Sequence, residues 1–250
     1  MLLVWDIETA PDRTKTAGVF EFADASVVGG GKAFPKLIYH SIICIGALAA
    51  YRTDAGWEVQ ALGAQHVGKQ SEKVLIETFV DFVAEHQPQM VTFNGHSFDL
   101  PVLRYRAIIN GLSAPGLQSR SYYHRFTDDH IDVCDVLSSY NFGGKAKLDE
   151  MSRVMGLPGK PDGIDVSQVE TYYNAGRINE IADYCQSDVV NTYRLWLRHE
   201  LFRGRLTQDE FEYSDQSAIR SETSLTSPKD AVAVLLMPAR GIKLTSMLGL

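Results

Sequence analysis

The chain has 250 residues, of which 45% are hydrophobic and 22% charged, and its formal net charge is −7 at pH 7. This composition is ordinary for a globular protein, and the length suffices for one large domain or two small ones. No apolar run approaches the roughly 20 residues that span a bilayer, and the N-terminus lacks the basic leader of a signal peptide. Three widely separated cysteines without a CxxC pair predict reduced thiols in a cytoplasmic protein, not a disulfide framework or a zinc site.

The negative charge bears on the choice of partner. Proteins that bind nucleic-acid phosphates tend to be basic, so −7 argues at first against such a partner. Metal-binding carboxylates, however, make a site acidic until divalent cations neutralise it. Basic residues also gather in the middle of the chain: Arg104, Arg106, Arg120, Arg125, Lys145, Lys147, Arg153 and Lys160. Any one of them is as readily an ordinary solvated charge, so the composition permits a nucleic-acid enzyme without requiring one.

The first predicted element is a short apolar strand over residues 2–6, which ends at the acidic pair Asp6 and Glu8. Residues 10–38 have little periodicity and three consecutive glycines, and they predict a long loop that acts as a lid or a substrate guide. The following patterns predict strands over 41–51 and 57–62, a helix over 71–85 with Ser71 as its N-cap, and a strand over 90–94.

The second half of the chain is mainly helical. A helix is expected to begin near Asp99 and to end at about Asn110, where Gly111 stops it. Residues 130–137 predict a strand that leads into a short helix. Further helices are expected over 146–156, 166–175, 177–203 and the start of the tail after Thr207, with a turn-rich loop over 159–168. This order predicts an α/β fold in which helices flank a central mixed sheet.

Asp6 and Glu8 lie two residues apart on the first predicted strand, so their side chains project from one face. Two such carboxylates can share a hard cation. An isolated DxE pair more often marks a strand that leaves the core for solvent, but here Val4 and Trp5 place the pair directly at the end of a buried segment.

Three further residues extend this site. Asp99 begins a helix, a position where carboxylates are also common for capping alone. His96, in the same turn, is interpreted as a solvated loop residue. Tyr184 and Asp188 are one helical turn apart and share a face, whereas Cys185 and Val189 fall one position further round, towards the core.

Four acids brought together would repel one another without cations, which is a reason to expect a metal site. Two divalent ions about 4 Å apart can activate a water and stabilise a leaving 3′ oxygen. A phenol has a reference pKa of about 10 and is neutral near pH 7, so Tyr184 is expected to orient the water by hydrogen bonding and not to act as a full base.

The segments DIET, NGHSFD and YCQSD resemble the three exonuclease motifs of the DEDD superfamily, and Tyr184 indicates its tyrosine (DEDDy) branch. The stretches HIDVCDVLS and GKPDGIDVSQVETYYNAGRINEIADYCQSDVVNTYRLWL resemble stand-alone bacterial proteins related to the family B DNA polymerase exonuclease domain. The resemblance covers residues 1–203 and implies a ribonuclease H-like mixed β-sheet flanked by helices. Residues 204–250 are expected to form a C-terminal extension packed on the same domain.

The resemblance also implies an activity: 3′→5′ hydrolytic removal of nucleotides as nucleoside 5′-monophosphates, with two Mg²⁺ or Mn²⁺ ions. The expected substrate is the 3′ end of single-stranded nucleic acid, with DNA favoured and RNA left open. By position in the motifs, the implied roles are metal ligation by Asp6, Glu8, Asp99 and Asp188, orientation of the nucleophile by Tyr184, and contact with the terminal nucleotide by Thr9, Asn94 and Phe98. For Phe98, a place in the core is nearly as good an interpretation.

Two other functions stay open. A non-catalytic nucleic-acid-binding module would keep the fold but is expected to lack at least one of the five motif residues, and all five are present here. A nuclease for short oligonucleotides would suit the acidic composition, and the dependence of affinity on substrate length would distinguish it from an enzyme that processes polymers.

Overall fold

The computed structural model describes residues 1–14, 35–159 and 168–224. Within these residues, five strands form a mixed sheet in the order β3-β2-β1-β4-β5. The strands are β1 (Leu2–Pro11), β2 (His40–Thr53), β3 (Gly56–His66), β4 (Gln89–Thr92) and β5 (His130–Asp132). The pairs β1–β2 and β2–β3 are antiparallel, whereas β1–β4 and β4–β5 are parallel. The expected α/β sheet flanked by helices is confirmed.

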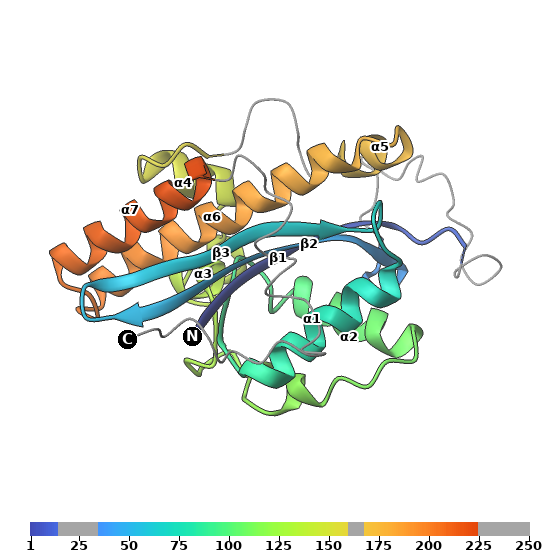
Figure 1. The fold of residues 1–250 in the computed structure, drawn as a ribbon, viewed down its shortest axis with the longest axis horizontal. Coiled ribbons are helices and arrows are strands. Elements are labelled where there is room, and N and C mark those ends of the chain that lie inside the picture. The colour runs from blue at the N-terminus through green and yellow to red at the C-terminus, as the bar shows by residue number, and fades with distance from the viewer. Residues whose placement is uncertain (15–34, 160–167, 225–250) are drawn as a thin grey trace, which may run out of the picture.

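The helices cover both faces of this sheet, as Figure 1 shows, with α1 and α2 on one side and α6 and α7 on the other. Their bounds are α1 (Glu72–His86), α2 (Asp99–Ile109), α3 (Val133–Leu137), α4 (Leu148–Val154), α5 (Val169–Asn174), α6 (Ile178–Phe202) and α7 (Gln208–Ser224). Short 3₁₀ helices lie at Leu37–Tyr39, Pro115–Gln118 and Phe142–Gly144. Among the described residues, no helix is long and apolar enough to cross a membrane.

Alternation along β1 divides the core into two halves. Leu3, Trp5 and Ile7 pack with side chains of α1 and α2 in one hydrophobic cluster. Leu2 and Val4 pack with side chains of α6 in another. Successive residues of a strand point to opposite faces. Asp6 and Glu8 therefore lie on the same face of β1 as Leu2 and Val4, which is the face that α6 covers.

Several helix boundaries follow from local chemistry, as the sequence predicts. The Ser71 hydroxyl accepts a hydrogen bond from the Val74 N–H at 3.3 Å, which confirms it as the N-cap of α1. α2 begins at Asp99 and is followed by Gly111, whose φ of +66° lies in the left-handed region that favours glycine.

Four expectations about the segments need correction or lie at least partly outside the described residues. β1 continues to Pro11, because its backbone stays paired with β2 as far as His40. The acidic pair therefore lies inside the strand, and the expected loop over residues 10–38 is wrong at both ends. Its glycine-rich part falls within residues 15–34, which lie outside the described residues, as do most of the turn-rich loop over 159–168 and the tail after residue 224.

α7 packs against the edge strand β3 and against α6. The Ser214 and Ser217 hydroxyls accept hydrogen bonds from the N–H groups of Trp57 and Val59, at 2.8 and 2.9 Å. The outward-facing N–H and C=O groups of an edge strand have no neighbouring strand to bond with. The two serines of α7 thus provide hydrogen-bond acceptors for two outward N–H groups of β3. The division of the chain at residue 203 stays a prediction.

His130 joins β4 and β5 from inside the core. Its Nδ1 lies 2.9 Å from the carbonyl oxygen of Tyr122, and its Nε2 lies 2.8 Å from the Thr92 hydroxyl. A carbonyl only accepts, so Nδ1 carries the proton and Nε2 accepts from Thr92. Burial, helped by the neighbouring His96, lowers the pKa of His130 to about 3.

This shift predicts a pH-dependent stability. An unfolded histidine titrates near pH 6.5, so between about pH 6.5 and 3 the unfolded chain binds a proton that the folded chain does not. His130 therefore leaves the free energy of unfolding undiminished above pH 6.5 and lowers it as the pH falls towards 3. We expect a shallower fall in the variant His130→Gln, measured by urea unfolding across this range. The exposed His124→Gln is the control, and an unchanged slope in His130→Gln would contradict the assignment.

Candidate active site

Asp6 and Glu8 project from β1 towards α6. Both carboxylates and the Cys185 thiol each offer a ligand atom within 4.8 Å of the others. The shared face that the sequence predicts for the acidic pair is thus present. Asp6 is half-buried and Glu8 is buried, so little water is available to screen their charges.

Asp99 reaches the same strand from the start of α2, which lies on the opposite face of the sheet from α6. Its Oδ1 accepts a hydrogen bond from the backbone N–H of Ile7 at 3.1 Å, between the two acids of β1. Burial raises the pKa of Asp99, the Ile7 N–H opposes that rise, and the charge of Asp132 adds to it, so that the pKa lies at about 7. The Asp99 carboxylate therefore accepts a hydrogen bond from another strand, which a residue that only capped its own helix would not need to do.

The third contribution comes from α6. The Cys185 thiol lies 3.7 Å from both the backbone oxygen and Oδ2 of Asp6. Tyr184 directly precedes this cysteine, Asp188 follows one turn later, and both are buried. Cys185 and Val189 are fully buried, as the helical periodicity predicts.

Gly46 permits this close approach of α6 to the sheet. It pairs with Asp6 across the β1–β2 ladder, so a side chain there would share the face of Asp6. A Cβ at Gly46 would lie 2.8 Å from Cys185 Sγ and 3.1 Å from Val189 Cγ2. α6 therefore rests directly on the strand pair at the acidic residues.

Two of the three residues expected to contact the substrate, Thr9 and Phe98, lie against one histidine. Thr9 Oγ1 lies 2.9 Å from His40 Nδ1, and the Phe98 ring meets the His40 ring edge-to-face at 5.4 Å between centroids. Phe98 also packs against the core that contains Trp5, as the core interpretation expects, and its contact with a nucleotide stays a prediction. Sequence reasoning missed His40, since nothing local marks a histidine that is 31 residues away from Thr9.

Asn94 begins the turn over residues 94–98, with φ of +65°. Its side-chain Oδ1 accepts a hydrogen bond from Lys145 Nζ at 2.9 Å. The backbone N–H groups of Asn94 and His96 donate to the two carboxylate oxygens of Asp132, at 2.7 and 3.0 Å. Asp132 and Lys145 thus fix the turn that leads into Asp99.

His96 is not the solvated residue that the sequence suggests. Its side chain is only 3% exposed, and Nε2 contacts the Tyr122 carbonyl oxygen at 3.2 Å. Together with Asp132 and Asp135 it forms a second group with metal-ligand spacing. Asp132 already accepts three backbone N–H groups, and the Lys145 ammonium lies 2.7 Å from Asp135 Oδ1, so a cation already neutralises this second group, although His96 Nδ1 and the Asp135 oxygens accept or donate no hydrogen bond among the described residues. A structural role fits it better than a metal.

Several of the central basic residues have structural partners. Arg106 is buried and pairs with Asp12 and Glu72, at 2.8 and 2.6 Å. Arg125 Nη2 donates to Ser97 Oγ at 3.1 Å, and Arg125 Nε lies 3.4 Å from Asp135. Of these basic residues, Arg125 and Lys145 contact the turn over residues 94–98, whereas Arg106 stabilises the fold.

The contact between α6 and β2 gives a test of this geometry. Gly46→Ala should lower the free energy of unfolding by about 1–3 kcal/mol, because the added methyl group overpacks against Cys185. Cys185→Ala removes the nearest atom, so the double variant should lose less stability than the sum of the single variants. Urea unfolding of the four proteins measures this coupling. Cys134→Ala, at a buried cysteine elsewhere, serves as the control and should add independently.

Comparisons with known proteins agree with this architecture. Residues 32–230 match the family described as predicted 3′-5′ exonucleases related to the exonuclease domain of PolB. This match begins after β1 and therefore does not include Asp6 and Glu8. It extends past residue 203 and takes in α7.

Two curated relatives are the DNA polymerase epsilon catalytic subunits A of Emericella nidulans and Aspergillus fumigatus, each 29% identical over 138 residues. These matches cover 52% of this chain but only 6% of each relative. A solved structure of the family B DNA polymerase from the hyperthermophilic archaeon Pyrobaculum calidifontis aligns with a TM-score of 0.55 at 21% identity, covering 87% of this chain and 26% of the polymerase. This likeness supports the ribonuclease H-like α/β fold.

Proposed function

The chain belongs to the family of predicted 3′-5′ exonucleases related to the exonuclease domain of PolB, and from that membership we propose a specific activity. The protein hydrolyses phosphodiester bonds from the 3′ end of single-stranded nucleic acid, with DNA favoured over RNA, and releases nucleoside 5′-monophosphates. The observation that carries the proposal is the convergence of three carboxylates on β1. Asp6 and Glu8 lie against Cys185 of α6, and Asp99, at the start of α2, accepts a hydrogen bond from the N–H of Ile7, the residue between them.

Asp6, Glu8, Asp99 and Asp188 would hold two Mg²⁺ or Mn²⁺ ions. Carboxylate oxygens are the donors that these hard cations prefer. The raised pKa of Asp99 supports the fit, because burial makes its negative charge costly until a cation stands beside it. When bound, such ions activate water and stabilise the charge on the leaving 3′ oxygen.

Cys185 belongs to the same cluster but is not proposed as a ligand. Burial raises the pKa of its thiol well above the ordinary value, and the neighbouring Cys44 and the charges of Asp6 and Glu8 add to the effect. A neutral thiol is a poor ligand for a hard cation. Its role is to pack α6 against Asp6.

Tyr184 would orient the attacking water by hydrogen bonding from α6. Thr9, Asn94 and Phe98 would contact the 3′-terminal nucleotide. Because Lys145 donates to Asn94 Oδ1, the Asn94 amide keeps its NH₂ group as the donor for a phosphate or sugar oxygen. His40 contacts both Thr9 and Phe98, so these two residues would form one continuous surface for the nucleotide.

The activity is tested by digesting a 5′-labelled single-stranded DNA and its RNA counterpart with Mg²⁺, with Mn²⁺ and with a chelator. We expect a metal-dependent ladder that shortens from the 3′ end, faster for DNA. Asp6→Ala should abolish it, whereas Asp81→Ala, at an exposed carboxylate on α1, should not. If neither polymer is cut with metal present, the proposal fails, and assays on di- and trinucleotides then separate a short-oligonucleotide nuclease from a non-catalytic module.

Tyr184→Phe separates orientation of the water from metal binding. We expect turnover to fall by about a hundredfold, because loss of one orienting hydrogen bond misplaces a reactant without removing a ligand. Metal affinity should stay near the wild-type value, whereas Asp188→Ala should lose both. Single-turnover rates and Mn²⁺ titrations measure the two quantities. Equal loss of metal affinity in Tyr184→Phe and Asp188→Ala would rule out the orienting role.

A further inference from the structure

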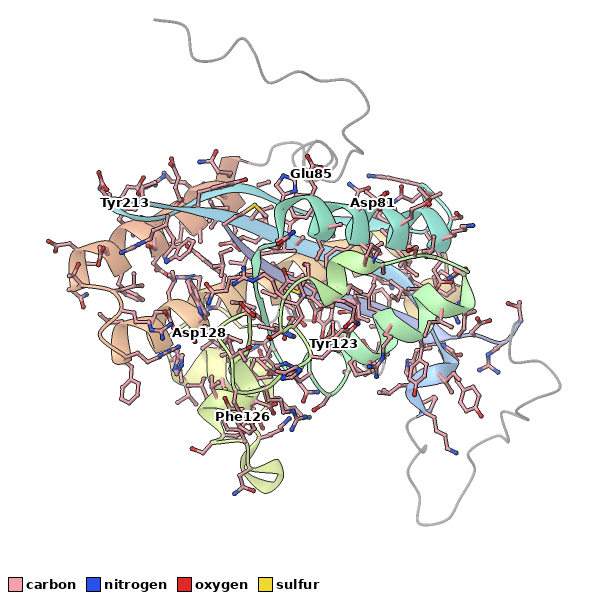
Figure 2. The ribbon with its side chains drawn as sticks, turned by 90° about the horizontal axis from the view of Figure 1, so that it is seen from below. Asp81, Glu85, Tyr123, Phe126, Asp128 and Tyr213 are labelled. Atoms are coloured by element: carbon pink, nitrogen blue, oxygen red, sulfur yellow. The ribbon has the colours of Figure 1, made fainter. Side chains whose placement is uncertain are left out.

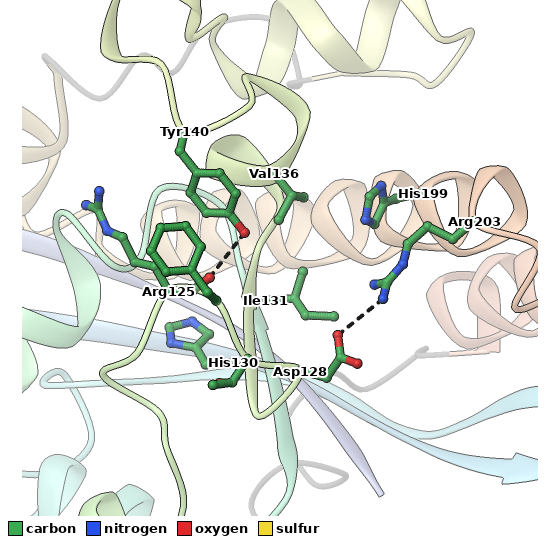
Figure 3. A pocket seen from close by; sticks show the side chains of 10 residues that line it. Arg125, Asp128, His130, Ile131, Val136, Tyr140, His199 and Arg203 are labelled. Atoms are coloured by element: carbon green, nitrogen blue, oxygen red, sulfur yellow. Dashed lines mark hydrogen bonds and ion pairs between the residues drawn. The ribbon is translucent and has the colours of Figure 1, made fainter.

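A hollow of about 420 Å³ lies beside β5, the edge strand of the sheet (Figure 3). It is bounded by the segment before β5, by the residues after α3 and by the end of α6. Its polar and aromatic lining includes Arg125, Phe126, Asp128, Tyr140, His199 and Arg203. None of these residues belongs to the acidic site described above.

Two aromatic side chains stand open to solvent at this hollow. Phe126 is 81% exposed and Tyr140 is 38% exposed, and their ring centroids are 4.8 Å apart. Figure 2 labels Phe126 at the periphery of the molecule. Exposed aromatic rings side by side are costly in water and are the surfaces on which nucleic-acid bases stack.

The backbone holds Tyr140 in place. Ser139 and Tyr140 have φ of +52° and +59°, a left-handed conformation that costs energy for residues other than glycine. The Tyr140 N–H donates to the Asp135 carbonyl at 2.7 Å, and its hydroxyl donates to the Arg125 carbonyl at 3.1 Å. The ring is therefore presented by a fixed loop, which lowers the entropy that a ligand would have to supply.

Cationic groups accompany the aromatic pair. Arg125 links the hollow to the acidic site, since its guanidinium donates to Ser97, two residues before Asp99. Arg203 and Arg205 pair with Asp128 at the opposite wall, at 3.3 and 2.7 Å. The pairs with Asp128 are open to solvent and therefore weak, so a phosphate can replace Asp128 as a partner at little cost. The second pair of Arg203, with the buried Glu200 at 3.0 Å, keeps its guanidinium at the hollow.

We propose that this hollow is a second nucleotide-binding subsite for the substrate strand. A base would stack on Phe126 and Tyr140, and successive phosphates of the strand would bind Arg125 at one wall and Arg203 at the opposite wall. The inference rests on the proposed function. If the 3′ end lies at Asp99, only the part of the strand on the 5′ side of the cut can extend past Ser97 and Arg125 into the hollow. The ligand is thus the single-stranded polymer, held several nucleotides away from the cut.

The test compares oligodeoxythymidylates of two to twelve nucleotides, bound in Ca²⁺ and followed by fluorescence anisotropy. Phe126→Ala should weaken binding of the long oligomers by about five- to a hundredfold, the effect of losing one stacked base. It should leave dinucleotide binding and dinucleotide turnover unchanged. Phe126→Trp should retain the long-oligomer affinity. Tyr51→Ala removes a 39% exposed aromatic from β2, away from β5, and should have no effect.

The outcomes separate this subsite from the proposed function. If the wild-type protein cuts single strands and Phe126→Ala binds twelve-nucleotide strands as tightly as wild type does, the subsite is overturned and the exonuclease stands. If dinucleotide turnover falls as much as long-oligomer affinity, Phe126 acts on the acidic site, and the subsite is again overturned. If the wild-type protein neither binds nor cuts an oligomer of any length, the proposed function is overturned, and the subsite with it. Melting temperatures of all variants check that each one is folded.

Discussion

The hydrogen bond from the Ile7 N–H to Asp99 ties together the parts of this molecule that form the candidate site. Ile7 sits on the central strand β1, with its side chain in the core beneath α1 and α2. Its neighbours Asp6 and Glu8 point to the other face. One backbone group thus connects the start of α2 to the strand between the two acids, so the position of β1 sets the positions of Asp6, Glu8 and Asp99.

Burial of these carboxylates carries an electrostatic cost that the protein only partly offsets. Asp99 receives a backbone donor, yet its pKa rises to about 7, and the negative charge of Asp132 contributes to that rise. Asp132 cannot simply be removed, because it holds the backbone of the turn over residues 94–98. The same charge that organises the turn therefore makes ionised Asp99 less stable. A cation bound beside Asp99, as proposed, would relieve that conflict and leave Asp132 in place.

Much of this arrangement could be predicted from the sequence, because it depends on local patterns. Strand alternation gave Asp6 and Glu8 a common face, and helical spacing placed Cys185 on the core side of α6. The residues that sequence reasoning missed or misjudged act across long separations. His40 contacts Thr9, and Lys145 contacts Asn94 across 51 residues. No local sequence pattern predicts contacts between residues so far apart in the chain.

The distribution of positive charge also differs from what a count of basic residues suggests. Arg106 belongs to the central basic group but is buried between Asp12 and Glu72. These two carboxylates neutralise its charge, so Arg106 stabilises the fold and does not attract phosphate. Lys145 and Arg125 remain close to the turn over residues 94–98. In a chain of net charge −7, long-range attraction to a nucleic acid is therefore weak. Recognition of the proposed substrate would then come from short-range contacts at the turn and at the Phe126–Tyr140 pair, where stacking does not depend on net charge.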